Sequence, residues 1–343
     1  MQFLAEYGLF FAKSITLLVI LLIVVATVAA VGTRGRRGEP GQLEIRSLNK
    51  QYNNLRDIVA GGLLPADEHK AALKTRRREE KRRLKKGRDM AGKRVFVVDF
   101  HGDLKASAAR SLREEVTALL TEATAADEVV VRLESSGGMV HGYGLAASQL
   151  DRIRKAGVPL TVCIDKVAAS GGYMMACVAN RIIAAPFAFV GSIGVVAQLP
   201  NFYRLLKKHD IDYEVLTAGE HKRTMTIFGE NTDKDREKFV EDLQETHDLF
   251  KQFVAEHRPA VDIDTIATGE VWLGTRAEAL GLVDEVMTSD EYINGQMDSA
   301  GIFSVCYRHR KSLPEKVGFA AEESVDNLLL RWVRRLSHPR HEA

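Results

Sequence analysis

Beyond residue 94, short apolar runs alternate with segments of helical periodicity, and this alternation restricts the possible folds more than any other feature of the chain. Four of the runs have the length and continuity of buried strands: 95–100, 129–133, 160–164 and 182–185. Between the second and third runs, residues 142–155 place Leu145, Leu150 and Ile153 at helical spacing. Alternating strands and helices predict an α/β fold with a parallel sheet and flanking helices.

The second half of the chain carries further, shorter signals. A fifth strand is predicted over Tyr213–Thr217, and a long helix is predicted over 233–256. The apolar stretch Phe303–Tyr307 comes next. A basic amphipathic segment over 328–336 follows, and we expect it to pack on a core or on a neighbouring subunit rather than to lie on a membrane.

The N-terminal part contains a long apolar run, Ile15–Val31, which only Thr16 and Thr27 interrupt. About 20 helical residues cross the hydrocarbon core of a bilayer, so this run predicts a single transmembrane helix in the cell (inner) membrane. A cleaved signal peptide is the alternative, because Val28-Ala29-Ala30 has the small residues of a cleavage site. The run is long for a signal peptide, and we therefore expect residues 1–32 to be a retained anchor.

Three arginines follow this run directly, at positions 34, 36 and 37. Positive residues beside a membrane span tend to stay in the cytoplasm. The charge distribution therefore favours a cytoplasmic location for the rest of the chain, although it does not decide the side of the membrane.

A strongly charged stretch connects this anchor to the globular part, and its basic residues concentrate over 74–86. It has too few apolar residues to build a core, so residues 33–94 are expected to form a basic tether that is partly helical. Contact with anionic lipid headgroups is the functional alternative. The net charge of the whole chain is only +2, and no aromatic residues are interleaved with the basic ones, so we do not expect nucleic-acid binding.

The cysteine pattern gives no sign of a disulfide framework or of a metal site. The three cysteines, Cys163, Cys177 and Cys306, cannot all pair, and their spacing does not match a zinc site. We expect buried free thiols, no metal ion and no cofactor.

The segment Ser170-Gly171-Gly172 is the first candidate for catalytic chemistry. It follows a predicted strand and opens a helix, which would place a hydroxyl beside free N–H groups that stabilise negative charge. An ordinary helix N-cap is the alternative reading of this serine. A second glycine pair, Gly137-Gly138, also follows a strand and offers backbone N–H groups to an oxyanion, unless it forms only a turn. Both pairs are expected at the same edge of the sheet.

A nucleophilic serine needs a base, and the residues alone leave several candidates open. The histidine candidates are His141, His221 and His247, and Asp165 could orient one of them. Lysine is the other possibility, because an apolar setting lowers its pKa and leaves the amine neutral. Lys222, which follows the predicted fifth strand, is the candidate of this kind.

Four motifs with compatible spacing resemble the family of membrane serine proteases that includes SohB and signal peptide peptidase A. In order, they are Val167-Ala168-Ala169-Ser170-Gly171-Gly172-Tyr173, Gly191-Ser192-Ile193-Gly194-Val195, Ala218-Gly219 with Lys222, and Gly269-Glu270-Val271-Trp272-Leu273-Gly274 with Ala277, Ala279 and Gly281-Leu282-Val283-Asp284. The resemblance covers about residues 95–290, which we take as the catalytic domain, leaving 291–343 as a C-terminal extension.

The resemblance implies a role for each matching residue. Ser170 corresponds to the nucleophile, Lys222 to the general base, and Ser192 to the serine that holds the lysine amine. The backbone N–H groups of Gly137, Gly138 and Gly171 correspond to the oxyanion hole. The family usually has proline before the first of these glycine pairs, and this chain has Ser136 there instead, which implies a less rigid loop.

The resemblance also implies a Clp protease or crotonase-like fold and assembly into a homo-oligomeric ring, in which adjacent subunits can share a serine and a lysine. The expected function is a membrane-anchored serine endopeptidase. Its expected substrates are peptides or unfolded polypeptides, such as signal-peptide remnants or envelope proteins. The alternatives are a crotonase-type acyl-CoA hydratase or isomerase, and a non-catalytic membrane scaffold.

Overall fold

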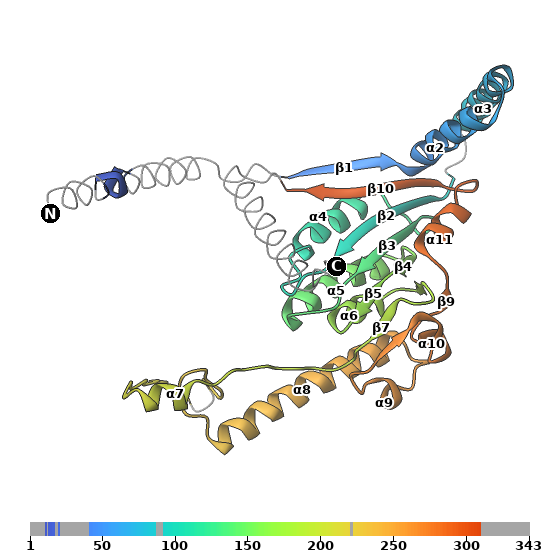
Figure 1. Ribbon diagram of the computed structural model, residues 1–343. Coiled ribbons are helices and arrows are strands. Elements are labelled where there is room, and N and C mark those ends of the chain that lie inside the picture. The colour runs from blue at the N-terminus through green and yellow to red at the C-terminus, as the bar shows by residue number, and fades with distance from the viewer. Residues whose placement is uncertain are drawn as a thin grey trace, which may run out of the picture. The chain divides into compact units, whose positions relative to one another are not determined.

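A computed structural model of the chain describes residues 41–86, 92–219 and 222–309, together with residues 11, 13–17 and 20 (Figure 1). The chain divides into two compact units, Leu43–Tyr307 and a second one of Met1–Gln42 with Arg308–Ala343. Most of the predicted anchor and the whole segment 328–336 lie outside the described residues. Within the described ranges, no helix combines the length and the apolar character that a bilayer crossing needs.

A seven-stranded sheet, in the order β1-β10-β2-β3-β4-β6-β9, forms the centre of the larger unit. Its pairings from β10 across to β9 are all parallel, which confirms the predicted parallel sheet. The strands have these bounds: β1 Gln42–Ser47, β2 Arg94–His101, β3 Glu128–Glu134, β4 Leu160–Ile164, β6 Arg181–Ala184, β9 Glu285–Val286 and β10 Gly301–Arg308. The four strands predicted from apolar runs are β2, β3, β4 and β6.

Helices lie on both faces of this sheet. The described helices have these bounds: α2 Leu48–Leu63, α3 Ala66–Lys86, α4 Ala109–Leu119, α5 Val140–Lys155, α6 Gly171–Ala176, α7 Tyr203–Lys208, α8 Asp233–His257, α9 Ile263–Ile266, α10 Gly274–Ala279 and α11 Ser289–Gly295.

The sheet faces differ in the helices that they contact. Because side chains alternate along a strand, Val98 and Val131 face a large core that includes residues of α4, α5, α6 and α8. Val97 and Val130 face a smaller core, which α11 and the start of α2 complete. Both faces of the central strands are therefore buried, and this explains why their sequences are continuously apolar.

A second, three-stranded sheet carries the candidate catalytic segment. It consists of β5 (Val167–Ala169), β7 (Phe189–Gly191) and β8 (Val271–Leu273), in that order. The pairing of β5 with β7 is parallel, and that of β7 with β8 is antiparallel. An isolated bridge between Ser135 and Ala168 joins this small sheet to the end of β3.

Several predicted elements are confirmed and one is wrong. The predicted helix over 233–256 is α8, and the predicted helix over 142–155 is α5. The predicted strand Tyr213–Thr217 is wrong, because this segment has no regular secondary structure. Its aromatic residue instead packs against Phe228, with the ring centroids 5.7 Å apart.

The sheet extends past the expected catalytic domain of residues 95–290 at both ends. β1 comes from the segment predicted as a tether, and β10 comes from the predicted C-terminal extension. β10 lies between β1 and β2, so the stretch Phe303–Tyr307 is an inner strand of the sheet. The charged stretch after β1 is helical, as expected, and forms α3.

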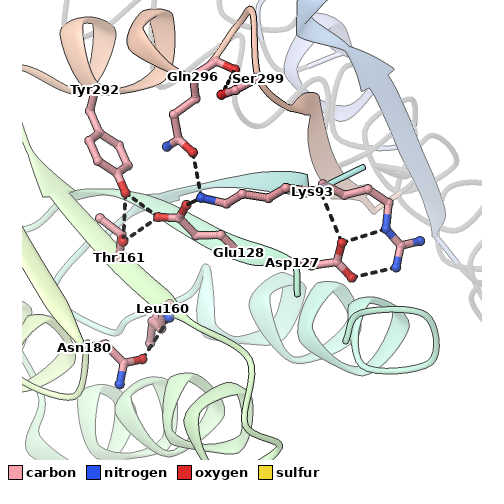
Figure 2. Close-up of polar contacts among 10 residues, drawn as sticks. Lys93, Asp127, Glu128, Leu160, Thr161, Asn180, Tyr292, Gln296 and Ser299 are labelled. Atoms are coloured by element: carbon pink, nitrogen blue, oxygen red, sulfur yellow. Dashed lines mark hydrogen bonds and ion pairs between the residues drawn. The ribbon is translucent and has the colours of Figure 1, made fainter. Parts of the chain in front are cut away.

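A polar network closes the edge of the sheet where β3 and β4 begin (Figure 2). The carboxylate of Glu128 is buried, and it accepts hydrogen bonds from Lys93 Nζ at 2.6 Å, from Thr161 Oγ1 at 2.7 Å and from the Tyr292 hydroxyl. Burial alone would raise the pKa of Glu128, but these donors hold it below its usual value. The network fixes α11, which carries Tyr292, to the strands.

A buried carboxyl on α4 gives a prediction for the pH dependence of stability. Burial raises the pKa of Glu115 to about 7, even though its Oε1 accepts a 2.7 Å hydrogen bond from the Tyr307 N–H. The folded chain thus holds a proton that the unfolded chain releases near its usual pKa of 4.5. Stability is therefore expected to fall as the pH rises from about 4.5 to about 7.

Glu115→Gln removes this titration and keeps an acceptor for the Tyr307 N–H. We expect the variant to exceed the wild type in the free energy of unfolding at pH 8 by on the order of 2 kcal/mol, with a smaller gain at pH 5. Urea unfolding at the two pH values measures this difference, with the exposed Glu122→Gln as the matched control. An equal effect of Glu115→Gln at both pH values would contradict the assignment.

Candidate active site

Ser170 lies at a sharp turn between β5 and α6. Its backbone has φ 52° and ψ −120°, a region that residues with a Cβ rarely occupy. The turn is held by hydrogen bonds from the Ser170 N–H to the Gly191 carbonyl at 2.8 Å and from the Met174 N–H to the Ser170 carbonyl at 3.0 Å. Strain of this kind costs about 1–3 kcal/mol and concentrates at functional sites, where a strand-to-helix turn can present a nucleophile.

Glycines around this serine allow backbone segments to approach more closely than any other residue would. A Cβ on Gly137, which has φ +89°, would lie 2.7 Å from the Ser170 Cβ. A Cβ on Gly171 would lie 2.4 Å from the ring of Tyr143, and one on Gly138 would lie 2.2 Å from the Leu104 carbonyl oxygen. The loop after β3 therefore lies directly against the Ser170 turn, so the structure brings the two glycine pairs together.

The three glycine N–H groups predicted for the oxyanion hole differ in their hydrogen bonding. The Gly137 N–H donates to Ser135 Oγ at 3.1 Å. Ser135 Oγ in turn lies 2.6 Å from the Tyr143 hydroxyl, which donates to the Asp103 carbonyl at 2.8 Å. The N–H groups of Gly138 and Gly171 have no acceptor among the described residues, so these two remain available to a ligand.

Sequence reasoning missed the part played by Ser135 and Tyr143. Both side chains are buried, and together they connect the glycine loop to the end of β2. The sequence contains a weak signal for Ser135, which directly precedes the Ser136-Gly137-Gly138 motif. It contains none for Tyr143, whose role depends on contacts between segments that only the fold brings together.

Ser192 occupies a position equivalent to that of Ser170 at the end of the neighbouring strand. It follows β7, has φ 53°, and its N–H donates to the Glu270 carbonyl at 2.6 Å. The parallel register pairs Ala169 with Gly191, so the two serines are the next residues along adjacent strands. Both serines line the same cleft.

This cleft has a volume of about 1120 Å³. Its walls include Gly137, Gly138 and Gly171 as well as both serines, and its remaining lining is mostly apolar, from α5, α6 and α8. A cleft with a few convergent polar groups in an apolar wall is typical of a ligand site.

The candidate bases are distributed unevenly around the cleft. His247, on α8, lines it and lies with Nε2 3.2 Å from the Ile193 carbonyl oxygen. His141 is exposed on α5 and is not part of the lining, and His221 lies outside the described residues. Asp165 accepts hydrogen bonds from the N–H and the hydroxyl of Ser289, so it is engaged at the start of α11 and not with a histidine.

Lys222 lies between α7 and α8 and is exposed to solvent. It is not among the residues that line the cleft around Ser170. In this single chain, the structure therefore brings together Ser170, Ser192 and the three glycines but does not add Lys222 to them.

The segment that carries Lys222 has an unusual surface. We define the arm as residues 195–231, which run from the end of the small sheet through α7 to the start of α8 (Figure 1). Large apolar side chains are exposed along it, with Leu216 91% and Val196 80% exposed. The others are Leu199, Phe202, Leu205, Ile211, Tyr213, Val215, Ile227 and Phe228. So many exposed large apolar side chains on one segment are typical of an interaction site.

Known sequences resemble this chain over nearly its whole length. The profile described as "Peptidase family S49 N-terminal" matches residues 2–150, and the one described as "Peptidase family S49" matches residues 152–302. The "Probable protease SohB" of Haemophilus influenzae is 48% identical to this chain. The alignment is 344 residues long, gaps included, and covers 97% of each chain. The "Probable protease SohB" of Buchnera aphidicola subsp. Schlechtendalia chinensis is 46% identical over 303 residues, covering 85% of this chain and 99% of the relative.

The chain belongs to peptidase family S49. It is a SohB-type member, because its similarity to the Haemophilus influenzae relative extends over nearly the whole length. The candidate site combines both family segments. Gly137 and Gly138 come from the part that the N-terminal profile matches, whereas Ser170, Gly171 and Ser192 come from the part that the second profile matches.

Two glycines that line the cleft of this S49 peptidase offer a matched comparison. Gly138→Ala would place a Cβ 2.2 Å from the Leu104 carbonyl oxygen, whereas a Cβ on Gly144 would meet nothing within 4 Å. We expect Gly138→Ala to lower kcat/KM for peptide cleavage by at least about 100-fold, because the loop predicted to bind the oxyanion must shift. Gly144→Ala should be close to neutral, or slightly stabilising, because alanine favours a helix. Equal activity of the two variants would contradict the role given to the loop.

Proposed function

We propose that this S49 peptidase is a serine endopeptidase in which Ser170 is the nucleophile and Lys222 the general base. The observation that carries the proposal is the cleft that Ser170, on its strained turn, lines together with Gly138 and Gly171, whose N–H groups have no acceptor among the described residues. This is the combination of nucleophile and oxyanion donors that acyl transfer requires.

The proposed reaction proceeds by acyl transfer. The neutral amine of Lys222 takes the proton of the Ser170 hydroxyl while the oxygen attacks the peptide carbonyl. The Gly138 and Gly171 N–H groups stabilise the oxyanion, and the Gly137 N–H joins them if it leaves Ser135 Oγ. The protonated amine then donates to the leaving nitrogen, and water hydrolyses the acyl-enzyme. The Ser192 hydroxyl holds the lysine amine in place.

The position of Lys222 leads us to propose that the active site forms between subunits. An exposed lysine is a poor base at neutral pH, and burial of the arm against a second copy would remove it from water. The exposed apolar residues of the arm, such as Phe202 and Leu216, are the surface that such an assembly would cover. A homo-oligomeric ring would allow the arm of one subunit to bring its Lys222 to the Ser170 of the next.

We further propose that the apolar run Ile15–Val31 anchors the protein in the cell (inner) membrane. The arginines that follow it favour a cytoplasmic catalytic part. Anchoring would give the cleft access to polypeptides at the membrane, and signal-peptide remnants or unfolded envelope proteins are the proposed substrates. The apolar lining of the cleft suits hydrophobic peptide segments.

Reaction with a fluorophosphonate probe tests the chemistry without knowledge of the substrate. The probe is expected to add once per chain, at Ser170, and the labelled protein should lose casein cleavage in proportion to labelling. Peptide mapping by mass spectrometry locates the adduct, and Ser192→Ala, which retains Ser170, should still react. Labelling elsewhere, or full activity after labelling of Ser170, would refute the proposed nucleophile.

A further inference from the structure

The hairpin of α2 and α3 carries an apolar surface that the peptidase chemistry does not use. Four large side chains on α2 are exposed: Leu55 at 53%, Ile58 at 72%, Val59 at 59% and Leu63 at 78%. Ile58, Val59 and Leu63 follow Leu55 by three, four and eight residues, which places all four on one face of the helix. We call these four residues the α2 stripe.

The α2 stripe continues a face that is buried where the helix begins. Leu48 and Tyr52 on this face pack against the smaller core of the sheet. Asn49 holds the same end, because its Nδ2 donates to the Met297 and Ala300 carbonyls at 3.1 Å each, and its Oδ1 accepts from the Ile302 N–H at 2.7 Å. The helix is thus fixed at one end, and its apolar face runs on past the residues that cover it.

The second helix of the hairpin leaves the stripe open. α3 contacts α2 through an ion pair between Arg76 and Asp57, and through His69, whose ring leaves no room for a Cβ on Gly61. Successive residues of an α-helix are rotated by about 100° around its axis, so Asp57 and Gly61 lie on the side of α2 opposite the stripe. Figure 1 shows the hairpin projecting from the sheet with no other labelled element beside it.

The charge of α3 identifies the partner that suits this surface. Its 21 residues include ten Lys or Arg and four Asp or Glu, a net charge of +6. The whole chain is only +2, so the remainder has a net charge of −4. Exposed apolar residues beside a concentration of basic ones are typical of segments that bind at the surface of anionic bilayers. A second hairpin of the same charge would instead be repelled.

We propose that the α2–α3 hairpin is a second membrane contact, in which the α2 stripe enters the headgroup region of an anionic bilayer and the positive charge of α3, behind α2, attracts the hairpin to that surface. The inference rests in part on the proposed anchor, since only ten residues, 32–41, separate Val31 from β1. These residues span at most about 36 Å, so the start of β1 stays close to the bilayer.

The test follows the environment of Ile58 in the full-length protein. An environment-sensitive fluorophore is attached to Ile58→Cys in a Cys306→Ser background, in which the two remaining cysteines are buried. The matched control carries the label at Asn54→Cys, which is exposed on α2 outside the stripe. Both proteins are reconstituted into vesicles of phosphatidylcholine alone and of phosphatidylcholine with phosphatidylglycerol.

We expect the label at position 58 to shift to the blue and to gain about twofold in emission in the anionic vesicles, and not in the neutral ones. The label at position 54 should not change. A salt concentration of 1 M, which shortens the screening length to about 3 Å, should reverse the effect. Charge reversal at three exposed basic residues of α3, Lys70→Glu, Lys74→Glu and Arg78→Glu, should abolish it.

Two results would overturn the proposal. An unchanged spectrum at position 58 in anionic vesicles would mean that the stripe does not meet lipid. A change of equal size in neutral vesicles that grows with the protein-to-lipid ratio would mean that a second copy covers it. Flotation with neutral vesicles reports on the anchor separately, so failure of the anchor and failure of the hairpin contact are distinguishable.

Discussion

Ser170→Ala is expected to reduce kcat/KM for casein or a fluorogenic peptide by at least about 1000-fold, because it removes the proposed nucleophile of the acyl transfer. Assembly and stability should be unchanged, since no hydrogen bond of the Ser170 hydroxyl contributes to the fold in the described chain. The backbone strain at φ 52° remains with alanine, so the turn itself is conserved.

Ser148→Ala is the matched control for this variant. Ser148 lines the same cleft, but its hydroxyl donates to the Gly144 carbonyl within α5 at 2.8 Å and does not adjoin the glycine loop. We expect at least about half of the wild-type kcat/KM to remain. Substantial activity in Ser170→Ala, with loss in Ser148→Ala, would reject the assignment and require another nucleophile in the cleft.

The second large effect concerns Lys222. Lys222→Ala is expected to be as inactive as Ser170→Ala, because the serine then has no base. When the two inactive proteins are mixed in detergent, allowed to reassemble and assayed for peptide cleavage, activity should return. With random assembly, roughly one quarter of the interfaces would combine an intact serine with an intact lysine from the neighbouring subunit.

The mixing experiment separates the proposed arrangement from its alternatives. If the mixture stays inactive although size-exclusion chromatography shows mixed assemblies, the base acts within its own subunit and the arm must move. If Lys222→Ala is active by itself, the lysine is not the base. His247, which lines the cleft and lies beside Ile193, would then be the first candidate to test.

Local patterns in the sequence predicted the parts of the fold that local physics controls. The buried run Leu160–Ile164 coincides with β4, because a strand covered on both faces is apolar at every position. The Ser170-Gly171-Gly172 segment was recognised as a strand-to-helix turn, because glycines at such a point indicate close backbone approach. These features depend on residues that are close together in the chain, so they can be predicted from the sequence alone.

Features that depend on distant contacts were not predictable in the same way. The apolar spacing of Tyr213–Thr217 resembles a strand, but the segment joins neither of the two described sheets, and its side chains belong to the exposed arm. The hydrogen bond from the Gly137 N–H to Ser135 Oγ also could not be predicted, since Ser135 is held by Tyr143 from the following helix. The position of Lys222 outside the cleft could not be derived from its spacing in the chain.

The place of β10 between β1 and β2 has a consequence for biosynthesis. β1 is the first of the described strands to leave the ribosome, yet its partner in the sheet begins only at Gly301. The contact of Asn49 with Ile302 closes a loop of 253 residues. The strands β2, β3, β4 and β6 can pair as they emerge, whereas β1 and the start of α2 must wait until nearly the whole chain has been translated. A nascent chain that stops before residue 300 would therefore leave its first strand and an apolar helix face uncovered, which makes truncated products natural targets for chaperones and quality-control proteases.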